Sequence, residues 1–284
     1  MNPNGKPFPS FGHRSKKSLG QNFLVDENLL QKIVSLAKVG PDDQVLEIGP
    51  GLGNLTKYLV KNARKVFAVE LDSALAHQLK YKIWAQNLDV IEVDILEFNF
   101  NEIGVLDKKL KVISNLPYNI STQVIFKVLE SPGFFSELYL MLQKEVAERV
   151  VAKPHSRDYG ILSVIAQLHS EPEIILRIGP QAFRPRPKVD SALVKFKVLE
   201  QPRFAVSDYA HFKKVVKACF RQRRKMIINS LTGSSLALEK DKLEELLERA
   251  GISPRSRAEE IELERLVKLA NIYHQEKEQH AGTA

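Results

Sequence analysis

Four consecutive residues, Asn115, Leu116, Pro117 and Tyr118, have the types and order that point most directly to chemistry. The exocyclic amine of adenine is a poor nucleophile because its lone pair is delocalised into the ring. The side-chain oxygen of Asn115 and the backbone carbonyl of Leu116 are two acceptors that can draw both amine hydrogens out of conjugation and aim the lone pair at a methyl donor. Pro117 fixes a backbone angle, and the ring of Tyr118 can stack on a base. The same residues also make a good turn.

The stretch follows one of several predicted strands. Beyond a first strand that ends near Glu47, we predict strands at 65–71, 88–94, 110–116, 137–143, 173–178 and 190–198, and helices at 54–63, 73–86, 144–153 and 158–169. This alternation indicates a parallel sheet, with the last two strands paired like a hairpin. Ligands of such sheets lie beyond the carboxyl ends of the strands. We therefore expect Glu47, Glu70, Asp94 and Asn115 along one edge.

Alternate glycines, Gly49, Gly51 and Gly53, follow the first strand. Glycine tolerates positive φ and has no Cβ, so this turn lets the backbone lie against a ligand. The dinucleotide fingerprint G-x-G-x-x-G is not matched, because Asn54 or Thr56 stands where its third glycine belongs. A nicotinamide dinucleotide is disfavoured, whereas a purely structural turn stays open.

Two acidic strand ends suit the two parts of a nucleoside. Glu70, at the end of the second strand, is placed to accept hydrogen bonds from both ribose hydroxyls. Asp94, one strand along, is placed to accept from an adenine amino group, with a helix N-cap or a solvated strand end as the alternative.

The composition is that of an ordinary globular protein with an excess of positive charge. The 284 residues carry 42 Lys and Arg against 34 Asp and Glu, a net charge of +8, which favours a polyanionic partner. Cys219 is the only cysteine, so an internal disulfide and a multi-cysteine metal site are excluded, and we expect no metal and a reducing cytoplasmic location. No apolar run approaches a membrane span, and we expect a monomer.

Two basic segments flank the predicted core. Residues 1–18 form an arm without acidic residues that includes Lys16 and Lys17; we expect it to be disordered in isolation and either to contact nucleic acid or to be a solvated tail. The proline-rich loop near Phe183 carries three cations, Arg184, Arg186 and Lys188. An exposed aromatic ring among them suits a flipped-out base, and the alternative is a stiffened turn with Phe183 in the core.

From about residue 204 onward, the spacing of apolar residues is that of helices throughout. A basic helix is predicted at 209–231, followed by helices at 239–250 and 258–275. We expect the first to track a phosphate backbone, chiefly through Arg221, Arg223, Arg224 and Lys225, although a solvated charged face is the usual meaning of such runs. The predicted domains are the arm at 1–18, a catalytic domain at 19–200, a small all-helical domain at 204–276 and a disordered tail at 277–284.

Together these motifs resemble one family over residues 16–273. The motifs on which the resemblance rests are Lys-Ser-Leu-Gly-Gln-Asn-Phe-Leu at 17–24, Glu-Ile-Gly-Pro-Gly-Leu-Gly at 47–53, Glu-Leu-Asp at 70–72, Asp94, Asn-Leu-Pro-Tyr-Asn-Ile-Ser at 115–121, Phe-Arg-Pro-Arg-Pro-Lys-Val-Asp-Ser-Ala at 183–192 and Arg-Arg-Lys-Met-Ile-Ile-Asn-Ser-Leu at 223–231. The chain is similar to the ribosomal RNA adenine N6-dimethyltransferases, within the class of S-adenosylmethionine-dependent methyltransferases.

The resemblance implies a Rossmann-like, seven-stranded α/β sheet with a small helical C-terminal domain. It implies that S-adenosyl-L-methionine is the cofactor, held by Asn22, Leu24, Gly49, Gly51, Glu70, Asp94 and Asn115. Asn115 to Tyr118 would hold the target amine and Phe183 would form the second face of a base sandwich. The implied substrate is two adjacent adenosines in the 3′-terminal hairpin loop of small-subunit (16S) ribosomal RNA, during assembly of the 30S subunit.

Three other functions stay open. A large-subunit dimethylase of the macrolide-resistance type is a close relative, although the loop at 183–192 and the Arg-Arg-Lys-Met helix resemble it less. A non-enzymatic ribosome-assembly factor could share the fold, against which the intact Asn115 and Tyr118 argue. A nucleotide-dependent oxidoreductase is disfavoured by the glycine spacing.

Overall fold

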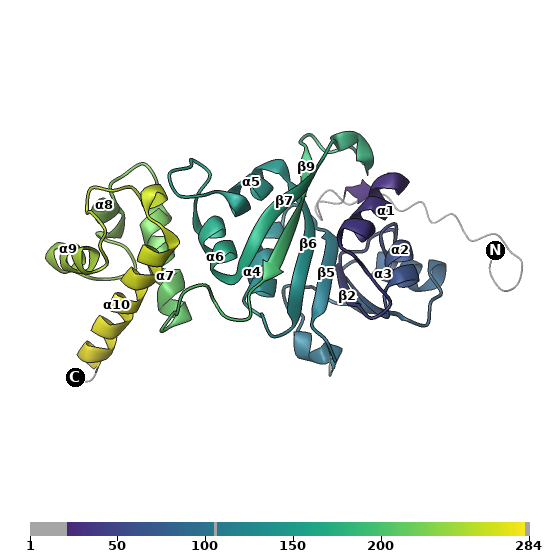
Figure 1. The fold of residues 1–284 in the computed structure, drawn as a ribbon, viewed down its shortest axis with the longest axis horizontal. Helices are drawn as coiled ribbons and strands as arrows, with labels where there is room; N and C mark the ends of the chain where they lie inside the picture. The colour runs from purple at the N-terminus through teal and green to yellow at the C-terminus, as the bar shows by residue number, and fades with distance from the viewer. Residues whose placement is uncertain (1–21, 105–106, 282–284) are drawn as a thin grey trace, which may run out of the picture. The chain divides into compact units, whose positions relative to one another are not determined.

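The computed structural model describes residues 22–104 and 107–281 (Figure 1). Lys16 and Lys17, and the whole predicted arm, therefore lie outside the described residues. The chain groups into two compact units. One comprises residues up to 127, 133–144 and 175–195, and the other comprises 128–132, 145–174 and 196 onward. This grouping cuts the chain differently from the predicted boundary at 200–204, which stays a prediction.

A seven-stranded sheet has the order β4-β3-β2-β5-β6-β9-β7 (Figure 1). Its strands are β2 (Gln44–Ile48), β3 (Lys65–Glu70), β4 (Leu88–Glu92), β5 (Leu110–Asn115), β6 (Phe135–Gln143), β7 (Ser170–Ile178) and β9 (Ser191–Val198). The pairs β3/β4, β2/β3, β2/β5 and β5/β6 are parallel. Every residue of β2 is buried, as expected of a central parallel strand, whereas the edge strand β4 is partly exposed. The predicted mostly parallel α/β sheet is confirmed.

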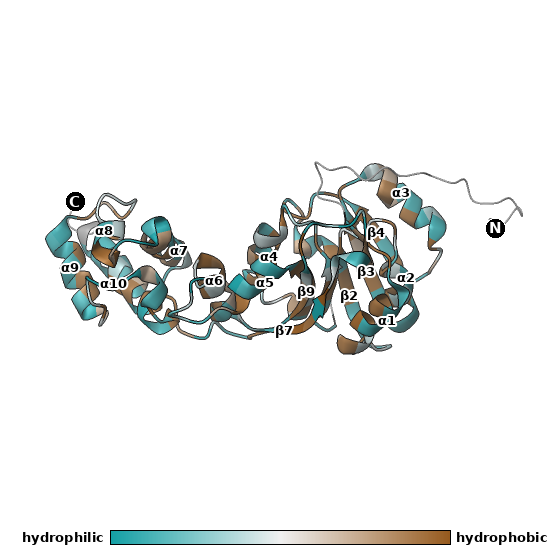
Figure 2. Cartoon of the chain, turned by 90° about the horizontal axis from the view of Figure 1, so that it is seen from above, coloured by the Kyte–Doolittle hydropathy of each residue, from teal (hydrophilic) through white to brown (hydrophobic). Residues whose placement is uncertain are grey.

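The helices α2 (Thr56–Asn62), α3 (Ser73–Lys82), α5 (Lys144–Val151) and α6 (Ile161–His169) lie at predicted places. The helix α1 (Glu27–Leu36) precedes β2, and α4 (Ser121–Leu129), which was not predicted, follows β5. Asp26 caps α1, because its side chain accepts a hydrogen bond from the Leu29 N–H at 3.0 Å. In Figure 2, α3 carries both hydrophobic and hydrophilic residues, and it buries Leu75 and Leu79.

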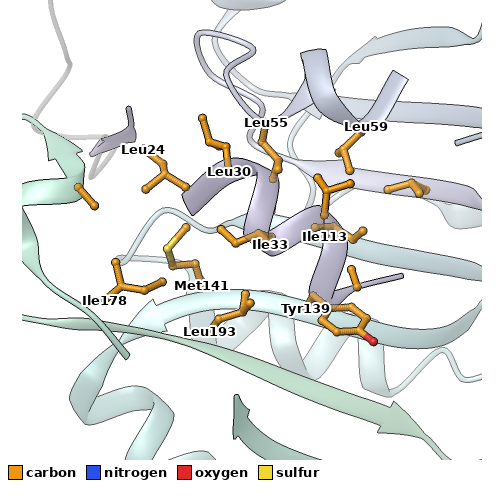
Figure 3. Close-up of a cluster of buried hydrophobic side chains, with 14 of the residues drawn as sticks. Leu24, Leu30, Ile33, Leu55, Leu59, Ile113, Tyr139, Met141, Ile178 and Leu193 are labelled. Carbon is orange, nitrogen blue, oxygen red and sulfur yellow. The ribbon is translucent and has the colours of Figure 1, made fainter. Parts of the chain in front are cut away.

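A small sheet attaches the start of the described chain to the loop after β7. Strand β1 (Phe23–Leu24) pairs antiparallel with β8 (Phe183–Arg184), so that Leu24 lies opposite Phe183. Both of these side chains belong to a buried cluster that also holds residues of α1, α2 and the sheet. Figure 3 shows Leu24 in this cluster with Leu30 and Ile33 of α1, near Met141 of β6.

The helical segments at the C-terminal end correct two predictions. They are α7 (Tyr209–Cys219), α8 (Ile227–Leu231), α9 (Lys240–Arg249) and α10 (Leu263–Ala281). The single basic helix predicted at 209–231 is interrupted between α7 and α8, because the polar run at 221–225 offers no apolar stripe to bury. The tail predicted to be disordered from 277 is helical through Ala281.

Gly53 offers a test of how tightly the turn after β2 is packed. Its φ is +80°, and a Cβ there would lie 2.6 Å from Leu79 Cδ1 and 2.9 Å from Ile83 Cδ1. Gly104 has a similar φ of +87° with no described atom within 4 Å of the same position. We expect Gly53→Ala to lower the unfolding free energy by about 1–3 kcal/mol more than Gly104→Ala, because only the first adds overpacking to backbone strain. Chemical denaturation of both variants measures this, and equal losses would contradict it.

Candidate functional site

A pocket of about 810 Å³, partly open to solvent, lies at the carboxyl ends of the central strands. Its lining comes from segments that follow four strands, together with the start of the described chain: Asn22, Phe23, Ile48, Gly49, Gly51, Val69, Glu70, Leu71, Val93, Asp94, Ile95 and residues 115–120. The parallel sheet therefore brings the predicted strand-end groups together at one edge.

The glycine turn lets two other segments approach the backbone closely. Gly49 and Gly51 have φ values of +65° and +57°. A Cβ on Gly51 would lie 2.7 Å from a ring carbon of Phe23, and one on Gly49 would lie 3.5 Å from Pro117 Cδ. The positive φ favours glycine at both positions, and a side chain at Gly51 would also overlap the Phe23 ring.

Glu70 accepts two backbone hydrogen bonds at the end of β3. Its Oε2 accepts from the Gly51 N–H at 3.0 Å, and its Oε1 accepts from the Asp72 N–H at 2.9 Å. Burial raises the pKa of Glu70, and these two hydrogen bonds oppose that increase. Each carboxylate oxygen has a second lone pair, so Glu70 can still accept from a ligand in the pocket.

Glu47 differs from the other strand-end acids. It is only 2% exposed, does not line the pocket, and its Oε2 has no hydrogen-bond partner among the described residues. Burial raises its pKa to about 8, with a further contribution from the charge of Glu70. The expectation that Glu47 faces the ligand edge is therefore wrong, since this side chain points into the protein interior.

Asp94 stands at the start of the turn that follows β4. Its Oδ1 accepts a hydrogen bond from the Leu96 N–H at 2.8 Å, so the side chain caps this turn and not an α-helix. Asp94 also lines the pocket and is half-buried. The hydrogen bond orients the carboxylate, and its contact with an adenine amino group stays a prediction.

The Asn-Leu-Pro-Tyr stretch begins at the last residue of β5. Asn115 donates from Nδ2 to the Asn22 carbonyl at 2.8 Å, which leaves its Oδ1 as the acceptor. Tyr118 is half-buried, and its hydroxyl is 2.8 Å from the Ser191 Oγ. Burial raises the pKa of Tyr118, so its hydroxyl stays protonated near neutral pH. All four residues line the pocket.

Two predicted site residues lie in the core instead. The Phe183 side chain has no exposed surface and belongs to the same buried cluster as Leu24. Neither side chain lines the pocket. The expectation that the Phe183 ring is exposed is wrong, and the alternative of a stiffened turn with Phe183 in the core is what the structure has, whereas a contact between Leu24 and the cofactor stays a prediction. The pairing of β1 with β8 turns both side chains inward. The pocket has Phe23 in their place.

The sequence analysis did not predict several other residues of the pocket lining. The apolar ones stand directly beside the predicted polar residues of the site: Ile48, Val69, Leu71, Val93, Ile95 and Ile120. Asn119, which is polar, follows Tyr118. Their position next to the predicted site residues could have indicated them. Leu71 is 51% exposed, an unusual exposure for a large apolar side chain and one that suits contact with a flat ligand.

The predicted RNA-binding cations fall into two groups. Arg186, Lys188, Arg224 and Lys225 are exposed. Arg184, Arg221 and Arg223 donate to backbone carbonyls: Arg184 to those of Gln181 and Phe183, Arg221 to those of Thr232 and Gly233, and Arg223 to those of Arg157 and Tyr159. Arg223 is also 3.7 Å from Glu259. These three arginines therefore stabilise loops.

Comparison with known proteins gives a consistent family. The model of the family described as ribosomal RNA adenine dimethylase matches residues 12–275. Proteins named ribosomal RNA small subunit methyltransferase A are similar: that of Geobacter metallireducens is 42% identical over 91% of this chain and 95% of its own length, and that of Syntrophotalea carbinolica is 45% identical over 92% and 97%.

Two solved structures share the fold. A dimethyladenosine transferase from Plasmodium falciparum is 27% identical, with a TM-score of 0.71 over 87% of this chain and 95% of its own. The 23S rRNA methyltransferase ErmE is also 27% identical, with a TM-score of 0.64 over 89% of this chain and 100% of its own.

Among residues 22–104 and 107–281, no helix is long and apolar enough to cross a membrane.

The buried Glu47 predicts a pH dependence of stability. Its folded pKa of about 8 exceeds the ordinary 4.5, so the stability of the neutral form is complete below pH 4.5 and is lost as the pH rises through 8. That difference corresponds to at most about 5 kcal/mol of unfolding free energy. We expect Glu47→Gln, which is neutral at every pH, to match the natural protein at pH 4 and to be more stable at pH 9. Urea denaturation at both pH values measures this, and parallel pH profiles would contradict it.

Proposed function

Because the chain belongs to the ribosomal RNA adenine dimethylase family, we propose that it transfers methyl groups from S-adenosylmethionine to the N6 amine of adenosines in small-subunit ribosomal RNA. The observation that carries the proposal is the meeting of Asn115, Tyr118, Glu70 and Asp94 in one pocket. The names of the relatives support the small subunit as the source of the RNA.

The pocket fits S-adenosylmethionine, which supplies an electrophilic methyl group on a sulfonium. The backbone of Gly49 and Gly51 lines the pocket and would lie against the amino-acid part of the cofactor. Glu70 would accept from the ribose hydroxyls and Asp94 from the adenine amino group, with exposed Leu71 beside them. Asn22 lines the same pocket, and its carbonyl holds Asn115.

Asn115 and Leu116 would orient the target amine. With Nδ2 held by the Asn22 carbonyl, the Asn115 Oδ1 accepts one amine hydrogen and the Leu116 carbonyl accepts the other. These contacts localise the nitrogen lone pair and aim it, which is catalysis by positioning and electrostatics, and the proton can leave after the methyl group arrives. Tyr118 would stack on the base, held by its contact with Ser191.

We infer dimethylation of two adjacent adenosines in the 3′-terminal hairpin loop of 16S RNA, within a 30S assembly intermediate. The motifs at 115–121 and 183–192 support this finer assignment through their resemblance to the small-subunit enzymes. The exposed cations Arg186, Lys188, Arg224 and Lys225 are candidates for phosphate contact. Lys16 and Lys17 remain candidates by charge alone.

A large-subunit dimethylase is the second candidate, which the similarity to ErmE favours. Tritiated-methyl transfer to unmethylated small and large ribosomal subunits, with the modified nucleotides mapped by primer extension, separates the two. We expect incorporation into two adjacent adenosines of the small subunit. Incorporation into large-subunit RNA alone would contradict the proposal, and none into either would favour an assembly factor without catalysis.

Asn115 provides the sharpest test of the catalytic assignment. We expect Asn115→Ala to lower kcat by at least about 100-fold, because one of the two amine acceptors is lost, while RNA binding stays within about threefold. Asn119→Ala is the matched control, since Asn119 is exposed and lines the pocket without an assigned contact. Single-turnover methyl transfer and filter binding measure the two effects. Unchanged kcat in Asn115→Ala would refute the role.

A further inference from the structure

Three side chains of types that can bind a metal ion lie close together in the second compact unit, in its part from residue 196 onward. None of them lines the pocket. Asp208 is the N-cap of α7, and its Oδ1 accepts from the His211 N–H at 2.6 Å. The Nδ1 atoms of His211 and His274 lie 2.9 Å apart, and Asp208 Oδ1 lies 3.5 Å from His211 Nδ1. One ligand atom from each of the three residues lies within 4.8 Å of the others.

These separations suit coordination of one ion. Two atoms bound to a tetrahedral zinc ion at about 2.05 Å lie about 3.3 Å apart. Two of the observed separations, 2.9 Å and 3.5 Å, lie on either side of that value, and the third is within 4.8 Å. A hydrogen bond between the imidazoles explains the approach of the two histidines, and the N-cap explains the position of Asp208. The N-cap bond leaves a carboxylate beside the two imidazoles, which is the ligand set of a metal site.

The surroundings resemble the outer shell of a metal site. Histidine ligands commonly present their second ring nitrogen to a carboxylate, and Glu278 Oε1 lies 3.5 Å from His274 Nε2. The His211 ring packs edge-on against Tyr273, with ring centroids 5.3 Å apart, and Tyr273 is buried. The side chains of Asp208, His211 and His274 are 38%, 30% and 19% exposed, so an ion can reach them from solvent.

We propose that Asp208, His211 and His274 bind a divalent transition-metal ion of the zinc type, with water completing its coordination. Two imidazoles and one carboxylate favour zinc, cobalt, nickel or copper over magnesium and calcium, which prefer oxygen ligands. Bound metal would tie the first turn of α7 to α10 and stabilise the packing of these two helices, because the metal binds only the folded arrangement. The cysteine count gave no signal of this site.

The test uses the full chain without an affinity tag. Cobalt(II) absorption and calorimetric titration with zinc(II) should show one saturable site, and zinc should raise the Tm. Asp208→Asn is the key variant, because asparagine keeps the N-cap of α7 but removes the anionic ligand. We expect it and His274→Gln each to weaken zinc binding at least about tenfold, and Glu278→Gln to weaken it about tenfold as an outer-shell change.

His77→Gln is the matched control for adventitious binding, since His77 is an exposed histidine near a single carboxylate, Glu92. It should leave zinc affinity and the Tm increase unchanged. Circular dichroism of each metal-free variant verifies folding before titration. A zinc Kd weaker than about 100 µM, or equal affinity in the natural protein, Asp208→Asn and His274→Gln, would overturn the proposal.

Discussion

The carboxylate of Glu70 holds together the loops that form the pocket at the carboxyl ends of the strands, and the rest of the site depends on it. It stands at the end of β3 and accepts hydrogen bonds from Gly51 in the turn after β2 and from Asp72 at the start of the next helix. One buried carboxylate thus holds two loops, one of which lies 19 residues before it in the chain. The pocket shape follows from this bond, because the positive φ of Gly51 and its close approach to Phe23 both require the turn to stay in place. A ligand that donates to Glu70 would reinforce a bond network that is already formed.

The two buried glutamates at the ends of β2 and β3 differ in their electrostatic surroundings. Glu47 and Glu70 stand in the adjacent strands β2 and β3, yet only Glu70 has backbone donors that oppose the effect of burial on its pKa. Glu47 lacks such donors on Oε2 and is held mostly neutral. Of these two carboxylates, only the oriented one of Glu70 lines the pocket. Asn115 is ordered similarly, since a backbone carbonyl holds its amide nitrogen and leaves its oxygen as an acceptor.

The sheet and its polar strand ends could be predicted because buried parallel strands are continuous apolar runs, and Glu70, Asp94 and Asn115 follow directly from where those runs stop. The position of Phe183 was predicted wrongly because it depends on pairing between strands that are far apart in the chain. Nothing local to Phe183 decides whether its ring is exposed, because that depends on the antiparallel partner Leu24, 159 residues earlier. Phe23 was missed for the same reason. The break between α7 and α8 could have been read from the uninterrupted polar run at 221–225, which no amphipathic helix could bury.

The arginines that donate to backbone carbonyls change what the net charge of +8 means for a polyanion. Arg184, Arg221 and Arg223 keep their charge, so they still contribute to long-range attraction, but their guanidinium hydrogens are partly committed to loops. Direct displacement of counterions from phosphates then falls more to Arg186, Lys188, Arg224 and Lys225. In the proposed complex with RNA, the rate of association would depend on the total charge of the molecule. The steepness with which added salt weakens the complex would instead depend on the guanidinium and ammonium groups that are left to contact phosphates.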